Sequence, residues 1–280
     1  MAARLRDLID RYDALLFDAF GVLVDQAGAR DGARDAIAAV RAAGRPLAIV
    51  TNDTSRLPAT AAARFTRLGL PIGADEVIGP GLLLPGHVRA HALAGARTIV
   101  LGTGDSHAYA AAAGLEVVDP RALGDGALDV DAVLVCDDDG FDFLPAMNAT
   151  LTACVRALDR GRALALVAPN PDLVYPRGGD ALGFTAGAMV LMLEAALARR
   201  YRPAPRFTTL GKPEPGLFEL ARARLPAGAR LVMIGDQLET DIAGARAAGV
   251  DGALVTGVSI WRDGAAPPDR APQWLLADLR

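Results

Sequence analysis

Residues 15–25 read LLFDAFGVLVD, and the rest of the chain can be interpreted outward from this stretch. A short apolar run over residues 14–17 ends at polar residues and predicts a buried β-strand. The strand delivers the carboxylate of Asp18 to its carboxyl end, and Gly21 permits a sharp turn shortly afterwards. In an open α/β sheet, binding sites form just beyond the carboxyl ends of the strands. Asp18 is therefore either a functional acid or an acid that only caps a loop.

Strand-like and helix-like segments alternate on both sides of this stretch. Apolar runs predict strands near residues 46–50, 97–101, 132–136, 163–168, 231–234 and 252–255. Ala-rich or amphipathic segments predict helices near residues 33–43, 58–68, 143–160, 183–199 and 216–225. This alternation is typical of parallel sheets covered by helices, so the predicted fold class is α/β. We expect two such units, a core over residues 1–78 and 200–280 and an insertion over residues 79–199.

Composition limits the partners that the chain is expected to have. Of its 280 residues 52% are hydrophobic, and the formal net charge is −4. No run of lysine and arginine indicates nucleic acid or a membrane surface as a partner. No apolar run approaches the roughly 18 residues of a membrane span, and no signal-peptide pattern is present, so we expect a cytoplasmic protein. The spacing of Cys136 and Cys154 favours two reduced, buried thiols over a disulfide.

Polar side chains follow several of the predicted strands. They are Asp18, Thr51, Lys212, Asp236 and Asp241. If these strands share one parallel sheet, the side chains converge at the edge formed by the strands' carboxyl ends. Clustered carboxylates repel one another, and a divalent cation relieves that repulsion; oxygen ligands of this kind suit Mg²⁺. A lysine and a hydroxyl beside them would hold a phosphoryl group, with one carboxylate as the nucleophile.

With these residues in place, the chain resembles the haloacid dehalogenase (HAD) superfamily, whose signature is four motifs in this order. The last two are intact as GKPEP at residues 211–215 and GDQLETD at residues 235–241. The resemblance is greatest to the NagD-like branch, which includes nitrophenylphosphatases, pyridoxal phosphatases and phosphoglycolate phosphatases. It implies a Rossmann-like core with an α/β cap inserted between the second and third motifs. Asn170 and Asp172, in an NPD segment near the end of the cap, are then expected on its substrate side.

The resemblance assigns the metal site and the nucleophile. Asp18 matches the nucleophile that forms an aspartyl phosphate. Mg²⁺ would be bound by Asp18, Asp236 and the backbone carbonyl of Phe20. A small phosphorylated metabolite is the implied substrate.

The resemblance also assigns the phosphate-binding groups. Thr51 matches the hydroxyl that binds the transferring phosphoryl group, assisted by the backbone amide of Asn52. Lys212 matches the cation that offsets the charge of nucleophile and phosphate. Asp241 would support Lys212 or a metal-bound water, and Thr240 would cap the following helix.

The first motif departs from the family pattern at one position. The family has Asp-x-Asp, whose second Asp protonates the leaving group and later activates water, but this chain has Asp18-Ala19-Phe20. General acid–base assistance contributes roughly 10²–10⁴ to rate, so its loss should slow ester hydrolysis. Asp53 is the nearest substitute in the sequence, although its side chain could equally cap the following turn.

Three functions are compatible with these residues. The first is a Mg²⁺-dependent phosphatase acting through Asp18. The second is a binding protein for a phosphorylated metabolite, with little or no turnover because of Phe20. The third is a metal-free dehalogenase, since an aromatic two residues after the nucleophile also occurs in the haloacid dehalogenases proper. Leu and Ala spacing over residues 183–199 is compatible with internal packing or with a homodimer formed through the cap.

Overall fold

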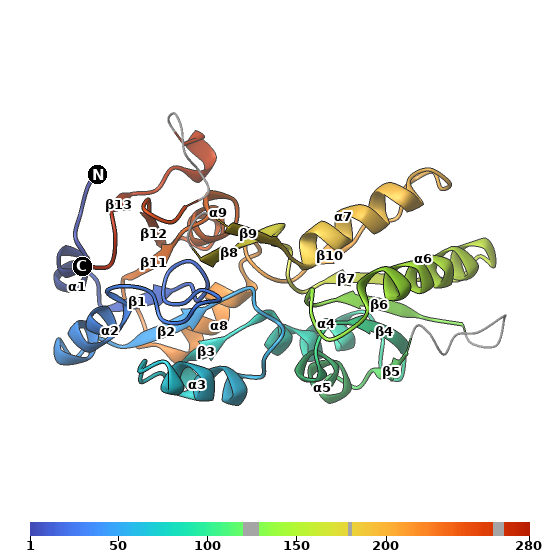
Figure 1. Cartoon of the computed structure of the whole chain (residues 1–280), viewed down its shortest axis with the longest axis horizontal. Coiled ribbons are helices and arrows are strands. Elements are labelled where there is room, and N and C mark those ends of the chain that lie inside the picture. The colour runs from blue at the N-terminus through green and yellow to red at the C-terminus, as the bar shows by residue number, and fades with distance from the viewer. Residues whose placement is uncertain (120–128, 179–180, 260–265) are drawn as a thin grey trace.

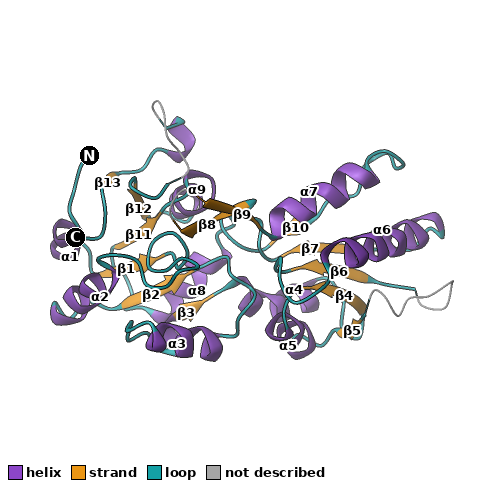
Figure 2. Ribbon diagram, viewed as in Figure 1, coloured by secondary structure: helices purple, strands orange, loops and turns teal. Residues whose placement is uncertain are grey.

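The chain forms two α/β units that lie side by side in the computed structural model (Figure 1). The structure describes residues 1–119, 129–178, 181–259 and 266–280. Each unit has its own sheet of parallel strands flanked by helices (Figure 2). The predicted α/β class is confirmed. No helix within the described ranges combines the length and apolarity needed to cross a membrane.

The core sheet places the first strand at its centre. The strand order is β13-β12-β11-β1-β2-β3, and every pairing is parallel. The strands are β1 (Ala14–Phe17), β2 (Leu47–Val50), β3 (Val77–Ile78), β11 (Leu231–Gly235), β12 (Asp251–Val255) and β13 (Trp274–Leu276). Phe17 is in register with Ile49 of β2 and Ile234 of β11. The three central strands therefore end level with one another, and the loops that follow them start at one edge.

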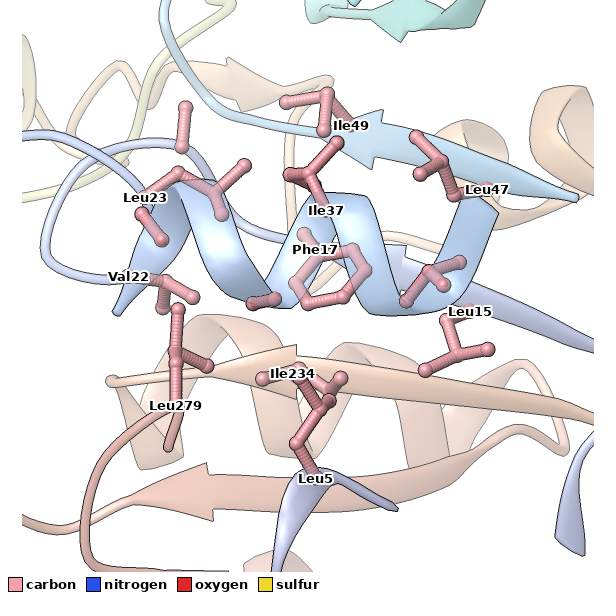
Figure 3. Packing of buried hydrophobic residues seen from close by; sticks show 14 of the residues in the cluster. Leu5, Leu15, Phe17, Val22, Leu23, Ile37, Leu47, Ile49, Ile234 and Leu279 are labelled. Atoms are coloured by element: carbon pink, nitrogen blue, oxygen red, sulfur yellow. The ribbon is translucent and has the colours of Figure 1, made fainter. Parts of the chain in front are cut away.

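Alternate residues of β1 face opposite layers of helices. Leu15 and Phe17 pack on one side with Ile37, as Figure 3 shows, whereas Leu16 packs on the other side with Phe218. Both layers are apolar because a central parallel strand is buried on its two faces. The core helices are α1 (Leu5–Arg11), α2 (Ala33–Ala42), α3 (Pro58–Arg67), α8 (Gly216–Arg224) and α9 (Ala243–Ala247).

The inserted unit, called the cap here, contains a second parallel sheet. Its order is β10-β7-β6-β4-β5. The strands are β4 (Arg97–Leu101), β5 (Glu116–Val118), β6 (Ala132–Val135), β7 (Ala165–Ala168) and β10 (Thr208–Thr209). The cap helices are α4 (Leu84–Ala90), α5 (Gly104–Ala112), α6 (Phe143–Asp159) and α7 (Ala186–Leu197). Because β10 pairs with β7, the cap sheet extends past the predicted boundary at residue 199. The chain returns to the core just before Gly211.

A hairpin missed by the sequence analysis connects the two units. It consists of β8 (Val174–Gly178) and β9 (Ala181–Phe184), which pair in antiparallel fashion. The predicted helix over residues 183–199 therefore begins only at Ala186, after the extended backbone of Thr185. Arg177 Nε of the hairpin donates a 2.6 Å hydrogen bond to Gln26 Oε1 of the core. The hairpin thus touches the loop that follows the first strand.

Two smaller expectations also have clear outcomes. Thr240 does not cap a helix: it lies inside a π-helical turn, Leu238–Ile242, that leads into α9. A single extra residue in this turn shifts the helix start away from Thr240. Cys136 and Cys154 are free and buried, as predicted, and burial raises the pKa of the Cys154 thiol to about 12.

Candidate active site

Three carboxylates meet at the edge where β1 and β11 end. Asp18 directly follows β1, and Asp236 directly follows β11. One oxygen of each, together with one from Asp241, lies within 4.8 Å of the others. All three side chains are buried. The convergence expected from the strand ends is present, and the distances are short enough for a shared cation.

Lys212 lies among these carboxylates and is only 2% exposed. Its ammonium Nζ donates to Asp18 Oδ1 at 2.7 Å, to Asp241 Oδ1 at 2.5 Å and to the Val50 carbonyl at 2.9 Å. Burial opposes its charge, but the surrounding carboxylates outweigh burial and raise its pKa above the usual value. Three acceptors match the three donors of an ammonium group, so Lys212 is a fixed positive charge beside Asp18.

Asp236 is the least satisfied group of the cluster. It is fully buried, and neither carboxylate oxygen has a hydrogen-bond partner among the residues that the structure describes. Burial, with Asp241 and Asp18 adding repulsion, raises its pKa well above the usual range. Burial likewise raises the pKa of Asp18 to about 7, although Lys212 opposes the shift. Unpaired, mutually repelling oxygens fit a hard divalent cation such as Mg²⁺.

The backbone around Asp236 and Asp241 leaves no room for side chains. Gly21 has φ +89°, and a Cβ on it would lie 2.4 Å from Asp236 Oδ2. A Cβ on Gly235 would lie 2.3 Å from the Asp241 side chain. Asp241 Oδ2 accepts the backbone N–H groups of Asp236 and Gln237, at 3.0 and 3.1 Å. Asp241 is therefore held by its own loop while its other oxygen accepts from Lys212, and its supporting role in catalysis stays a prediction.

The Asn52 side chain joins the loop after β2 to the loop that carries Lys212. Its Nδ2 donates to the Lys212 carbonyl at 3.0 Å, and its Oδ1 accepts the Lys212 backbone N–H at 2.7 Å. The same Nδ2 donates to Asp172 Oδ1 of the cap at 3.0 Å. The resemblance assigned a role only to the backbone amide of Asn52, and the side chain has these contacts in addition. Asn52 and Lys212 are 160 positions apart, so no local sequence pattern indicates this contact.

A cavity of about 300 Å³ opens beside this cluster and is lined from both units. Asp18, Thr51 and Gln237 line it from the core. Asn170 and Asp172 line it from the cap, and their contact with substrate stays a prediction. Burial raises the pKa of Asp172 to about 6. The cavity is at the lower end of the size range of small-molecule sites, about 300–1,000 Å³.

Phe20 and Asp53, the two positions considered for acid–base chemistry, have different surroundings. Phe20 lines the cavity with a ring that can neither give nor take a proton. Asp53 also lines it, but its Oδ1 accepts from Ser55 N at 2.7 Å and from Ser55 Oγ at 2.5 Å. Its Oδ2 accepts from Arg56 at 3.1 Å. These bonds favour the turn-capping interpretation of Asp53, and its acid–base role stays a prediction.

Other residues of the cavity had no assigned role in the sequence. Arg64 and Tyr175 come from a core helix and from the cap hairpin, and both line the cavity. Asp137 forms a turn, since its Oδ1 accepts the Asp139 N–H at 3.0 Å, and it faces the cavity as well. Burial and repulsion from Asp53 raise its pKa to about 7. Only the packing of the cap against the core brings these residues together.

The fold and the acid–lysine cluster define a class: a two-unit α/β protein with a buried acid–lysine site at the carboxyl edge of its core sheet. A profile of haloacid dehalogenase-like hydrolases matches residues 15–116, and a HAD-hydrolase-like profile matches residues 209–280. Human chronophin is 32% identical over 265 residues, covering 92% of this chain and 86% of chronophin. Chicken glycerol-3-phosphate phosphatase is 33% identical over 270 residues, covering 91% and 83%. The chain belongs to the haloacid dehalogenase-like hydrolases.

Solved structures share the whole architecture. A possible sugar phosphatase of the HAD superfamily from Cytophaga hutchinsonii has a TM-score of 0.83 and 27% identity, with 100% of this chain and 98% of that one covered. A Mycobacterium tuberculosis glycerol phosphate phosphatase in complex with magnesium has a TM-score of 0.74 and 27% identity, with 97% and 77% covered. NagD from E. coli K-12 has a TM-score of 0.72 and 21% identity, with 96% and 97% covered, and supports the fold.

Proposed function

We propose that this chain is a HAD-type phosphatase that hydrolyses a small phosphorylated metabolite through a phospho-Asp18 intermediate and with Mg²⁺. The observation that carries the proposal is the pairing of Asp18 with Lys212 beside the unpartnered carboxylate of Asp236. The relatives named as phosphatases support the same chemistry.

Each residue of the cluster has a role in this reaction. Asp18, Asp236 and the Phe20 carbonyl would bind Mg²⁺, which when bound supplies charge neutralisation at the phosphoryl oxygens. Asp18 attacks phosphorus with a carboxylate oxygen. Lys212 opposes the rise in the pKa of that carboxyl and holds it in place, and Asp241 and Asn52 hold Lys212. The Thr51 hydroxyl and the Asn52 amide would bind the transferring group.

The decisive test measures hydrolysis of p-nitrophenyl phosphate with and without Mg²⁺. We expect Asp18→Asn to abolish turnover and EDTA to do the same to the unaltered chain. Asp13→Asn is the matched control, because Asp13 lies just before the same strand but is exposed and bonded to Arg230 at the surface. Turnover that survives Asp18→Asn contradicts the proposal. Tight ester binding without turnover would favour the binding-protein alternative, and metal-free chloride release from a haloacid would favour the dehalogenase.

The relatives also suggest where to look for the metabolite. Two of them are named for glycerol phosphates, so glycerol 3-phosphate belongs in the first panel of substrates. The cap residues that line the cavity, among them Asn170 and Asp172, would contact the part of the metabolite beyond the phosphate. A cytoplasmic location stays a prediction.

A homodimer formed through the cap is the second part of the proposal. The cap exposes large apolar side chains, which is typical of surfaces that bind another protein. They are Phe143, Leu144, Leu182, Phe184, Leu191 and Met192. Light scattering on the purified chain should give twice the mass of one chain. The double variant Leu191→Lys with Met192→Lys should have the mass of a single chain. A monomeric unaltered chain would contradict the dimer.

A further inference from the structure

The wall of the cavity next to the nucleophile is aromatic. The Phe20 ring lies edge-on to Tyr175, with centroids 5.9 Å apart and an interplanar angle of 82°. The Arg64 guanidinium carbon lies 4.9 Å from the centre of the same ring. All three side chains line the cavity that also contains Asp18. The ring is thus held in place by neighbours, and no titratable side chain is present at position 20.

The carboxylates elsewhere in the cavity have other partners. Asp53 is bonded to Ser55 and Arg56. Asp172 accepts from Asn52, the residue that holds the Lys212 loop. Asp137 accepts the Asp139 N–H and Asp139 accepts the Gly140 N–H, in a turn that also contains Asp138. The position two residues after Asp18 itself carries the Phe20 ring and no proton donor.

We propose that this chain, acting as the phosphatase described above, is selective for phosphates whose leaving anions are stable, namely aryl phosphate esters and acyl phosphate anhydrides, and that it hydrolyses phospho-Asp18 slowly. Alkyl phosphates would be poor substrates. The inference rests on the proposed function and departs from the glycerol phosphates that the relatives suggest.

The chemistry follows from the missing proton donor. Asp18 attacks phosphorus, the bond from phosphorus to the ester oxygen breaks, and that oxygen leaves with the electron pair as an anion. Water then attacks phospho-Asp18, releasing inorganic phosphate and a proton, which neutralises the departed anion. A phenol has a pKa of about 10. An alcohol is close to water, at about 16, so without an acid only the phenoxide leaves readily.

Both halves of the reaction are affected, but in different ways. The first step slows in proportion to the basicity of the leaving group. The second step lacks a base to activate water, and its rate is the same for every substrate because the intermediate is the same. With a good leaving group the first step outruns the second, so phospho-Asp18 accumulates. An aryl group also gains contact with the rings of Phe20 and Tyr175.

The experiment compares a series of substituted phenyl phosphates with glycerol 3-phosphate. Stopped-flow mixing with p-nitrophenyl phosphate should give a burst of nitrophenol that approaches one equivalent per chain. Acid quench and intact-mass measurement should detect the phosphorylated chain. The value of kcat/KM should fall steeply along the series and be lowest for glycerol 3-phosphate.

Replacement of Phe20 separates proton transfer from shape. Phe20→Asp should raise kcat/KM for glycerol 3-phosphate by about 10²–10⁴, flatten the dependence on leaving group and remove the burst. Phe20→Asn is the matched control, because it has the same shape as Asp, loses the ring equally and has no acid; its kcat/KM for glycerol 3-phosphate should not show the rise expected of Phe20→Asp, and its dependence on the leaving group should stay steep. Thermal melts of both variants show that they are folded.

Four outcomes decide the inference. A steep series with a burst supports it. Equal rates for aryl and alkyl esters, or no burst, overturn it, and Asp137→Asn or Asp53→Asn then identifies the carboxyl that donates. Absence of turnover with every aryl ester also overturns it. If Asp18→Asn retains full turnover, the proposed function fails and the inference fails with it; if Asp18→Asn is inactive while the rates are equal, only the inference fails.

Discussion

At the scale of single residues, Gly21 shows how little space surrounds the acid cluster. Its φ of +89° is accessible to glycine at little cost, and a Cβ there would overlap Asp236 Oδ2. The substitution Gly21→Ala therefore combines left-handed strain, about 1–2 kcal/mol, with displacement of Asp236. We expect a lower melting temperature and the loss of the extra stability that Mg²⁺ provides, both measurable by thermal denaturation with and without the ion.

Gly44→Ala provides the control for this prediction. Gly44 also has a positive φ, +65°, but a Cβ on it meets nothing within 4 Å. Gly44→Ala should therefore lower the melting temperature through backbone strain alone, and the rise in melting temperature that Mg²⁺ gives should be unchanged. Equal responses to Mg²⁺ in both variants would show that the contact between residue 21 and Asp236 does not matter.

At the scale of elements, the start of α5 holds the loop that follows β2. The Ser106 hydroxyl is fully buried and donates to the Thr54 carbonyl at 2.9 Å. Thr103 Oγ1 donates to the Ser55 carbonyl at 2.6 Å, and Asp105 accepts the Leu57 N–H at 2.9 Å. A cap helix therefore positions the core loop that carries Thr51 and Asn52.

Ser106→Ala should weaken this support. It leaves the buried Thr54 carbonyl without its donor, at a cost of about 1–3 kcal/mol in unfolding free energy. Because the loop carries the proposed phosphate-binding groups, KM for p-nitrophenyl phosphate should also rise. Thr152→Ala is the control, since its hydroxyl is exposed and bonds within its own helix to Asn148. If both variants unfold at the same denaturant concentration, α5 does not support the loop.

At the scale of the whole molecule, the acid cluster couples stability to pH and to Mg²⁺. Burial raises the pKa of Asp18 from 3.8 to about 7 and that of Asp172 to about 6. A raised carboxyl pKa contributes stability that is complete below the unfolded pKa and is lost as pH rises through the folded pKa. The metal-free chain should therefore lose stability, on the order of a few kcal/mol, between about pH 4 and pH 7.

Magnesium should reverse this trend. The ion binds deprotonated ligands, so the stabilisation that it gives should grow from pH 5 to pH 8. Thermal melts at four pH values, in EDTA and in excess Mg²⁺, measure both curves. Asp236→Asn should raise the melting temperature in EDTA at pH 8 and abolish the response to Mg²⁺. A response to Mg²⁺ that is equal at all pH values would contradict coupling to these carboxyl groups.

Much of this molecule could be predicted from local sequence. The apolar run before Asp18 and the similar runs before Thr51 and Asp236 identified the strands of the core, because strands buried on two faces need continuous apolar residues. The strand ends then implied that these polar groups meet at one edge. The hairpin at Val174–Gly178 was missed because its residues are half exposed and contain Pro176, which gives no strand pattern.

By itself the sequence determined the parallel α/β architecture, the order of the motifs and the identity of the groups at the strand ends, since these depend on hydrophobic periodicity and on chain direction. Tertiary structure alone decided the partners of those groups. The bond from Asn52 to Lys212, the unpartnered oxygens of Asp236 and the ring of Phe20 against Arg64 and Tyr175 join segments that are far apart in the chain. Contacts of this kind arise from packing between loops of the core and, for Tyr175, from packing of the cap on the core, and no periodicity in the sequence records them.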